Sequence, residues 1–129
     1  DSVEGLQILK SHFVISTLSN GNFSMLTNMA KFSGLPWDCI ISAELAGHYK
    51  PDQITYQTAC SLLSLPPDKV MMVAAHTGDL EAAKQVGMKT AYVHRPLEFG
   101  PNRKIPMPDP SQFDVTAQNF LGLATSLQC

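Results

Sequence analysis

The amino-acid sequence predicts an α/β fold with an open parallel sheet. Short apolar runs rich in β-branched residues alternate along the chain with segments whose apolar side chains recur at helical spacing. The connections between these segments are short, so successive strands are joined through helices, and right-handed crossovers of this kind make the strands parallel. The chain has 129 residues, of which 44% are hydrophobic and 16% are charged, as expected for one soluble domain with its own core.

The first predicted elements are a helix, a strand and a second helix. Residues 2–10 place their apolar side chains on one helical face, and residues 12–18 form an apolar run typical of a strand buried on both faces. Residues 19–34 open on capping residues and close on Gly34, which predicts a turn followed by a helix. The later elements are a strand at 38–44, a helix at 51–65, a strand at 69–75, a helix at 78–87, a strand at 89–94, a Pro-rich loop at 96–110, a strand at 113–117 and a helix at 118–127.

Polar side chains follow the predicted strands at one edge of the sheet. Ligands of open parallel sheets bind at the carboxyl ends of the strands, so residues that come soon after a strand are candidates for a site. These candidates are Ser19, Asn20, Glu44, Lys50, His76, Asp79, His94 and Arg95. We expect His94 and Arg95 to have structural roles or to lie at the rim.

Ser19 and Asn20 allow two interpretations. They could cap the helix that follows by accepting hydrogen bonds from its free N–H groups. Together with Gly21 and Asn22 they could instead form an anion cradle, in which hydroxyl, amide and helix N-terminal N–H groups hold a carboxylate, a phosphate or a halide.

Lys50 is either a solvated lysine or a site residue placed by Pro51. The proline pushes Lys50 towards an extended backbone and favours a helix that starts immediately afterwards. A lysine fixed at this point can reach across the strand ends and hold a carboxylate in its ionised form. Tyr56, in the helix that follows, is either a core aromatic residue or a hydroxyl directed at the same site.

His76 and Asp79 also have a structural alternative. Both could cap the helix that starts near Gly78, and an acid in the first turn is electrostatically favourable. Their position after a buried strand equally favours a role in a site.

Composition and motifs exclude several classes of function. The formal net charge of -2 gives no reason to expect a nucleic acid or an anionic membrane as partner, and no apolar run approaches the ~20 residues of a membrane span. The three cysteines show no CxxC spacing and indicate free thiols of a reducing compartment, so a cytoplasmic location is expected, with a disulfide or a zinc site as the alternative. A Walker loop, a GxGxxG fingerprint, a GxSxG elbow and an HExxH motif do not occur.

Three segments, in this order, resemble the haloacid dehalogenase superfamily, and most closely its type II 2-haloacid dehalogenase-like branch. They are TLSNGN at 17–22, YKPD at 49–52 and VAAHTGDLEAAKQVGMKTAYVHRPLEFG at 73–100. The likeness covers nearly all of the chain from Asp1 to about Gly100. It implies a Rossmann-like three-layer sandwich and a hydrolase that acts on carbon–halide bonds.

The resemblance also implies a role for each matching residue. Ser19 and Asn20 would bind the carboxylate of the substrate and its surroundings. Lys50 would pair with a nucleophilic aspartate, and Asp79 would help to hold Lys50 and the hydrolytic geometry. Tyr56 would help to shape the pocket.

The last of the three segments separates two branches of the superfamily. The Mg²⁺-dependent phosphatases of the superfamily usually carry Gly-Asp where this chain has Ala74 and Ala75, and the aspartate of that pair is a metal ligand. Magnesium requires oxygen ligands, and Ala75 offers no carboxylate. The resemblance therefore implies chemistry without a metal or a cofactor, while a phosphatase that tolerates the missing ligand stays an alternative. His76 falls where these dehalogenases often carry asparagine, which places it among the expected substrate-binding residues.

The family's first motif, which carries the nucleophilic aspartate, has no match here, and neither does the helical cap domain. In the family the first strand lies centrally, between the strand of Thr17 and the strand of Val70, so we expect an incomplete sheet with unpaired edges. Residues 1–129 are therefore expected to form the C-terminal part of a core domain that is inactive alone. The expected partners are a small 2-haloacid or similar carboxylate and the N-terminal part of the same protein, and the resemblance also implies a homodimer. A non-catalytic binding or regulatory remnant is the alternative from another class.

Overall fold

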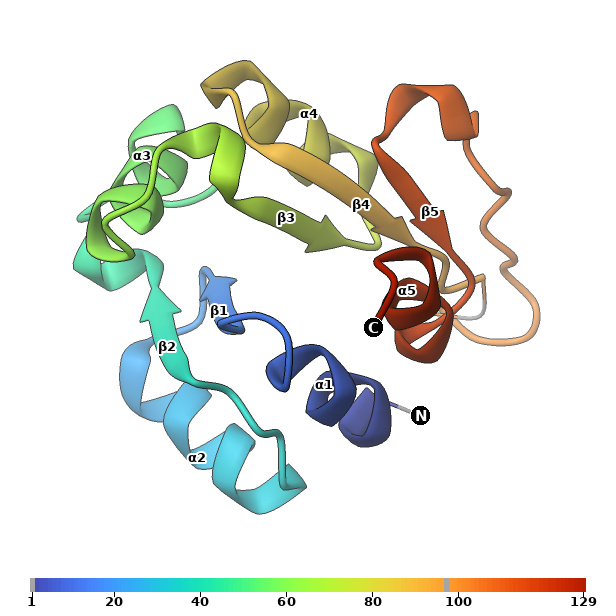
Figure 1. Ribbon diagram of the computed structural model, residues 1–129, viewed down its shortest axis with the longest axis horizontal. Coiled ribbons are helices and arrows are strands. Elements are labelled where there is room, and N and C mark those ends of the chain that lie inside the picture. Colours follow the sequence, from blue (N-terminus) through green and yellow to red (C-terminus); the bar gives the residue numbers. More distant parts are fainter. Residues whose placement is uncertain (1, 97) are drawn as a thin grey trace.

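Helices and strands alternate along the chain in the computed structural model, which describes residues 2–96 and 98–129 (Figure 1). The α-helices are α1 (Ser2–Lys10), α2 (Phe23–Ser33), α3 (Gln53–Leu62), α4 (Thr77–Val86) and α5 (Phe120–Ser126). The strands are β1 (Ser16–Ser19), β2 (Cys39–Ser42), β3 (Met71–Ala74), β4 (Lys89–Val93) and β5 (Val115–Ala117). Short 3₁₀ helices are η1 (Ala43–Leu45), η2 (Pro67–Lys69) and η3 (Pro110–Gln112).

The strands form two parallel sheets instead of one continuous sheet. β1 pairs with β2, with Thr17 opposite Ile40, while β4 lies between β3 and β5, with Ala91 opposite both Val73 and Val115. Among the described residues, no backbone pairing joins β1 to β3. The predicted α/β class with parallel strands is confirmed, and the interruption lies between the two strands where the family resemblance implied a missing neighbour.

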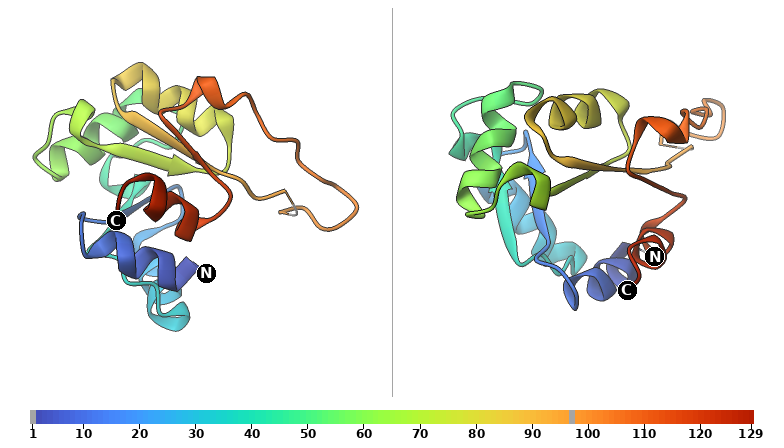
Figure 2. Two further views of the ribbon diagram at one scale, coloured as in Figure 1. Left: turned by 45° about the vertical axis from the view of Figure 1, so that its right-hand side comes forward. Right: turned by 45° about the horizontal axis from the view of Figure 1, so that its top comes forward.

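Helices cover both faces of the sheet β3–β4–β5 (Figures 1 and 2). On one face, α3 and α4 pack together and bury Tyr56 and Leu80 against the sheet. On the other face, α1 packs against α5, and Leu6 and Leu123 are buried there. Side chains of β4 alternate between these two cores, because Tyr92 belongs to the first and Ala91 to the second. The result is a helix–sheet–helix sandwich.

Two helices end at the glycines that the sequence indicated. Gly34 follows α2 with φ 68°, and Gly87 follows α4 with φ 99°. Both residues adopt the left-handed conformation, which glycine reaches without a steric penalty, and their N–H groups donate to carbonyls of the last turn. None of the described helices is both long and apolar enough to cross a membrane.

The predicted strand at residues 12–18 differs from the structure in position and in burial. β1 covers only Ser16–Ser19, its residues are half-buried along its whole length, and Phe13 and Val14 before it are exposed. The expectation of burial on both faces was therefore wrong for this element. β1 has β2 on one edge and, within the described part of the chain, no strand on the other, so fewer neighbours cover it.

Candidate functional site

Three side chains that the sequence singled out converge at the start of α4. The Lys50 ammonium lies 2.7 Å from Oδ2 of Asp79, and the Tyr56 hydroxyl donates to Oδ1 of the same carboxylate at 2.6 Å. The side chains of Lys50 and Asp79 are only 18% and 15% exposed. Each oxygen of Asp79 therefore accepts a hydrogen bond in a site that is largely shielded from water.

Three different elements supply this cluster. Lys50 stands in the loop between η1 and α3, just before Pro51, and the Lys50–Pro51 peptide is cis. Tyr56 comes from the first turn of α3, which begins after the N-cap Asp52, and Asp79 comes from the first turn of α4. The packing of α3 against α4 therefore sets the distance between the tyrosine and the aspartate.

The electrostatics of the cluster favour a neutral tyrosine beside an ion pair. Tyr56 is fully buried, and burial is the main cause that raises the pKa of its hydroxyl, followed by the hydrogen bond to Asp79. The hydroxyl therefore stays a donor at neutral pH. An ammonium has three N–H donors, and Asp79 accepts from one of them, so Lys50 retains donors that could hold a second carboxylate.

Asn20 contacts the backbone of Lys50. The backbone N–H of Lys50 donates to Oδ1 of Asn20 at 2.8 Å, and Nδ2 of Asn20 donates to the carbonyl of Lys50 at 3.3 Å. The end of β1 is thus joined to the loop that carries the lysine. Asn20 does not cap α2, because Asn22 does so by accepting from the N–H of Met25 at 2.8 Å.

The predicted anion cradle at residues 19–22 is partly occupied by the protein itself. The hydroxyl of Ser19 accepts from the N–H of Gly21 at 3.1 Å, which closes the turn before α2. The first N–H of α2, on Phe23, donates to a carboxylate oxygen of Glu44. Glu44 was a candidate without a partner at the level of sequence, and no local spacing could have paired it with the helix that follows β1. An internal carboxylate therefore takes one of the donors expected for a ligand.

His76 forms a separate contact with the Pro-rich loop. It occupies the N-cap position of α4, but its side chain makes no capping hydrogen bond. Its Nε2 atom lies 2.9 Å from both carboxylate oxygens of Glu98, and within the described part of the chain no hydrogen bond joins it to Lys50 or Asp79. The capping alternative for His76 is thus not what the structure shows, and its partner Glu98 was missed because nothing in the loop sequence marks it.

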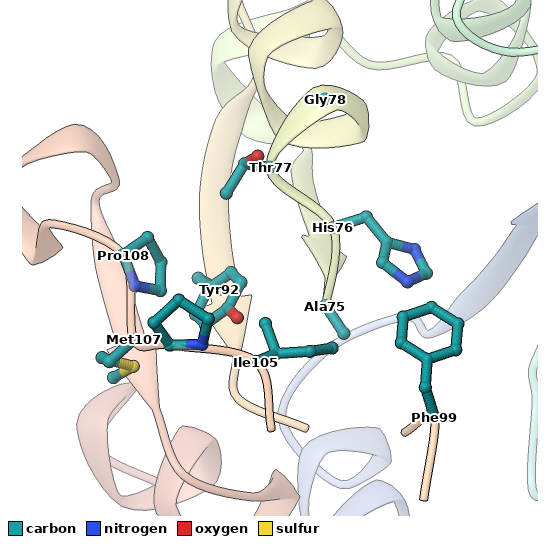
Figure 3. A pocket seen from close by; sticks show the side chains of 10 residues that line it. Ala75, His76, Thr77, Gly78, Tyr92, Phe99, Ile105, Met107 and Pro108 are labelled. Carbon is teal, nitrogen blue, oxygen red and sulfur yellow. The ribbon is translucent and has the colours of Figure 1, made fainter. Parts of the chain in front are cut away.

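Beneath the Pro-rich loop lies a cavity of about 460 Å³. Figure 3 shows His76 and Phe99 on one side of it and Tyr92 with the residues around Met107 on the other. Most of its lining is apolar, and burial followed by the nearby Glu98 raises the pKa of Tyr92. The lining residues are Ala75, His76, Thr77, Gly78, Tyr92, Phe99, Ile105, Pro106, Met107 and Pro108.

The residues after β4 have structural contacts. His94 is buried, and its Nδ1 atom lies 3.2 Å from the hydroxyl of Tyr92. The guanidinium of Arg95 lies over the ring of Phe120 at 5.2 Å from its centroid. These contacts agree with the structural or rim roles expected for both residues.

The sequence of the chain is similar to a known protein family and to curated proteins. A family model described as haloacid dehalogenase-like hydrolase matches residues 3–93. The chain is 38% identical over 98 residues to (S)-2-haloacid dehalogenase 4A of Burkholderia cepacia, an alignment that covers 74% of this chain and 42% of that protein.

Solved structures give the same result for the fold. An L-2-haloacid dehalogenase is 43% identical with a TM-score of 0.92, and the match covers 98% of this chain and 56% of that chain. A defluorinating L-2-haloacid dehalogenase is 42% identical with a TM-score of 0.93, covering 100% of this chain and 53% of that chain. The chain thus spans about half the length of the relatives that it matches.

Proposed function

Because the chain belongs to the haloacid dehalogenase-like hydrolase family, we propose that residues 1–129 are the C-terminal part of the core of a 2-haloacid dehalogenase. The observation that carries this proposal is the Lys50 ammonium, held by Asp79 at the edge where the strands end and retaining further N–H donors. The curated relative and both solved structures named above are described as 2-haloacid dehalogenases.

The proposed reaction has two steps and needs, in addition to Asp79, a nucleophilic aspartate that we expect from an N-terminal part of the same protein. A carboxylate oxygen of that aspartate attacks the halogen-bearing carbon of a small 2-haloacid, and the halide leaves with the bonding electron pair. Water then attacks the carbonyl of the resulting ester, which releases the 2-hydroxy acid and a proton and regenerates the carboxylate.

Lys50 has the central role among the residues of this chain. Its ammonium would keep the attacking aspartate ionised, because a nearby positive charge stabilises a carboxylate. Asp79 and Tyr56 would hold that ammonium in place. Ser19 and Asn20, at the end of β1, would orient the carboxylate of the substrate, and His76 would line the substrate side of the site.

The interruption between β1 and β3 supports a place for the missing nucleophile. Both strands lack a backbone partner towards each other among the described residues, and both end at the edge where Lys50 lies. A further parallel strand, from an N-terminal part of the same protein, would pair with both edges. Its carboxyl end would then lie at the same edge as Lys50, as the proposed mechanism requires.

Halide release tests the proposal directly. We expect the purified chain incubated with 2-chloropropionate to release no chloride above background, and we expect addition of an N-terminal fragment carrying the family's first motif to produce turnover. The matched control is the Lys50→Ala chain with the same fragment, which should stay inactive. Turnover by the chain alone, or equal turnover by the Lys50→Ala chain, would contradict the proposal. Mg²⁺-dependent hydrolysis of p-nitrophenyl phosphate would favour the phosphatase alternative and overturn the inference drawn from Ala75.

A further inference from the structure

We propose that Asn20 is a positioning residue for Lys50, in addition to its expected place at the substrate site. Its side-chain amide holds the backbone of Lys50 and thereby fixes the point from which the lysine side chain extends. The significance of this contact for the reaction rests on the function proposed above, whereas the contact itself does not.

The contact is reciprocal. Oδ1 of Asn20 accepts from the N–H of Lys50 at 2.8 Å, and Nδ2 of Asn20 donates to the carbonyl of the same residue at 3.3 Å. A carboxamide is the uncharged side-chain group that offers an acceptor and a donor side by side, so it can satisfy both backbone groups of one residue. Aspartate at this position would keep the acceptor and lose the donor.

The loop that carries Lys50 has little regular structure of its own. Gly47 adopts a left-handed conformation with φ 68°, and Pro51 has no N–H to donate. The Lys50 side chain loses much rotamer freedom when its ammonium is held at one point. A backbone that is already fixed reduces the additional conformational entropy lost in forming that contact. Asn20 supplies such a fixed point from the end of β1.

The contact extends across the interruption in the sheet. Asn20 directly follows β1 of the β1–β2 sheet, and it holds the backbone of Lys50, whose ammonium lies 2.7 Å from Asp79 on the helix after β3. The series Asn20–Lys50–Asp79 therefore connects the two sheets at the edge proposed as the site. An amide has two N–H donors, and the carbonyl of Lys50 accepts from one of them. Among the described residues the other has no acceptor, so it is available to a ligand.

Asn22 offers a matched control of the same residue type. Its Oδ1 atom also accepts a backbone hydrogen bond at 2.8 Å, but the donor is Met25 inside α2 and the contact only caps the helix. Asn20 and Asn22 both lie in the turn between β1 and α2, so removing either amide takes away a hydrogen bond made by that turn. Only removal of the Asn20 amide changes a contact with Lys50.

Amide hydrogen exchange and NMR of the chain itself test this inference without any activity measurement. In Asn20→Ala the exchange rate of the Lys50 amide should rise by about 2- to 10-fold, as expected for the loss of one hydrogen bond. The ammonium resonance of Lys50 should also move or broaden. Asn20→Asp, which keeps the acceptor, should show a smaller rise, and Asn22→Ala should leave both signals of Lys50 unchanged.

Two results would overturn the proposal. One is an unchanged Lys50 amide and ammonium in Asn20→Ala. The other is the same change in Asn22→Ala as in Asn20→Ala, which would mean general loosening of the loop. If Asn20→Ala does not fold, the comparison of Asn20→Asp with Asn22→Ala decides, because only the former touches Lys50. If the proposed dehalogenase function proves wrong, the exchange rate and the ammonium signal of Lys50 should still respond as described. The failure of one proposal can therefore be distinguished from the failure of the other.

Discussion

Two side-chain contacts with a carboxylate lie at the start of α4, and they differ in how much water reaches them. Lys50 and Asp79 are 18% and 15% exposed and share their site with the buried hydroxyl of Tyr56. His76 and Glu98 are 59% and 32% exposed, although their atoms approach to 2.9 Å. The distances are similar, so distance alone does not distinguish the two pairs.

The difference in burial determines what each pair can contribute. Water and salt screen an exposed pair, and such pairs typically stabilise a protein by about 0–1 kcal/mol. A shielded pair is different, because removal of one partner leaves the other charge without water or a counter-charge. We therefore expect the Lys50–Asp79 cluster to be rigid and costly to disturb, and the His76–Glu98 pair to hold its loop weakly.

Removal of the Asp79 carboxylate should have the largest effect. Asp79→Ala leaves both the Lys50 ammonium and the Tyr56 hydroxyl without an acceptor in a shielded site. We expect the free energy of unfolding, measured with urea, to fall by about 3 kcal/mol. Glu81→Ala is the control, since this acid is exposed on the same helix. Equal losses in the two variants would show that the Asp79 carboxylate stabilises the fold no more than an exposed acid does.

Replacement of Tyr56 by phenylalanine should have an intermediate effect and a distinct pH dependence. The variant keeps the ring in the core but loses a hydrogen bond to a charged group, which we expect to cost about 2 kcal/mol. Burial and Asp79 raise the pKa of Tyr56 above the value of about 10 expected for the unfolded chain. The folded state therefore retains a proton that the unfolded state loses. The resulting stability is fully present below pH ~10 and is lost as the pH rises through the folded pKa.

Urea unfolding at a series of alkaline pH values measures this contribution. The difference in stability between the native chain and Tyr56→Phe should be constant below pH ~10 and should shrink above it. A difference that stays constant across the alkaline range would mean that the hydroxyl titrates normally. In that case the pairing of Tyr56 with Asp79 would be weaker than its geometry indicates.

The comparison also shows which parts of the molecule the sequence could predict. The parallel α/β arrangement follows from hydrophobic periodicity, which each segment carries locally. Lys50 and Asp79 could be brought together because both follow strands and the carboxyl ends of parallel strands meet at one edge. Their proposed roles, like those of Ser19 and His76, stay predictions.

Other contacts had no local signal. Glu44 reaches the N–H of Phe23, and Glu98 reaches His76 from a Pro-rich loop, so each acid finds its partner only through the tertiary fold. The burial of β1 was overestimated for a related reason. An apolar run predicts a strand that is covered on both faces, but it does not show whether the strand has a partner on each edge.

Replacement of Glu98 by glutamine should have the smallest effect on stability and a local effect on the Pro-rich loop. The exposed pair with His76 should contribute about 0.5 kcal/mol, so urea unfolding should hardly change. The loop contains Arg103 and Lys104, both exposed, and trypsin cleavage there reports how often the loop leaves the surface. We expect faster cleavage in Glu98→Gln than in the native chain and no change in Glu4→Gln, which alters an exposed acid on α1.

A loss of stability as large as that of Asp79→Ala would contradict the distinction between the two pairs. Cleavage unchanged by Glu98→Gln would instead show that the loop is held without the His76–Glu98 contact. The hydrogen bond from the N–H of Ile105 to the carbonyl of Pro96 and the apolar wall of the cavity would then be sufficient.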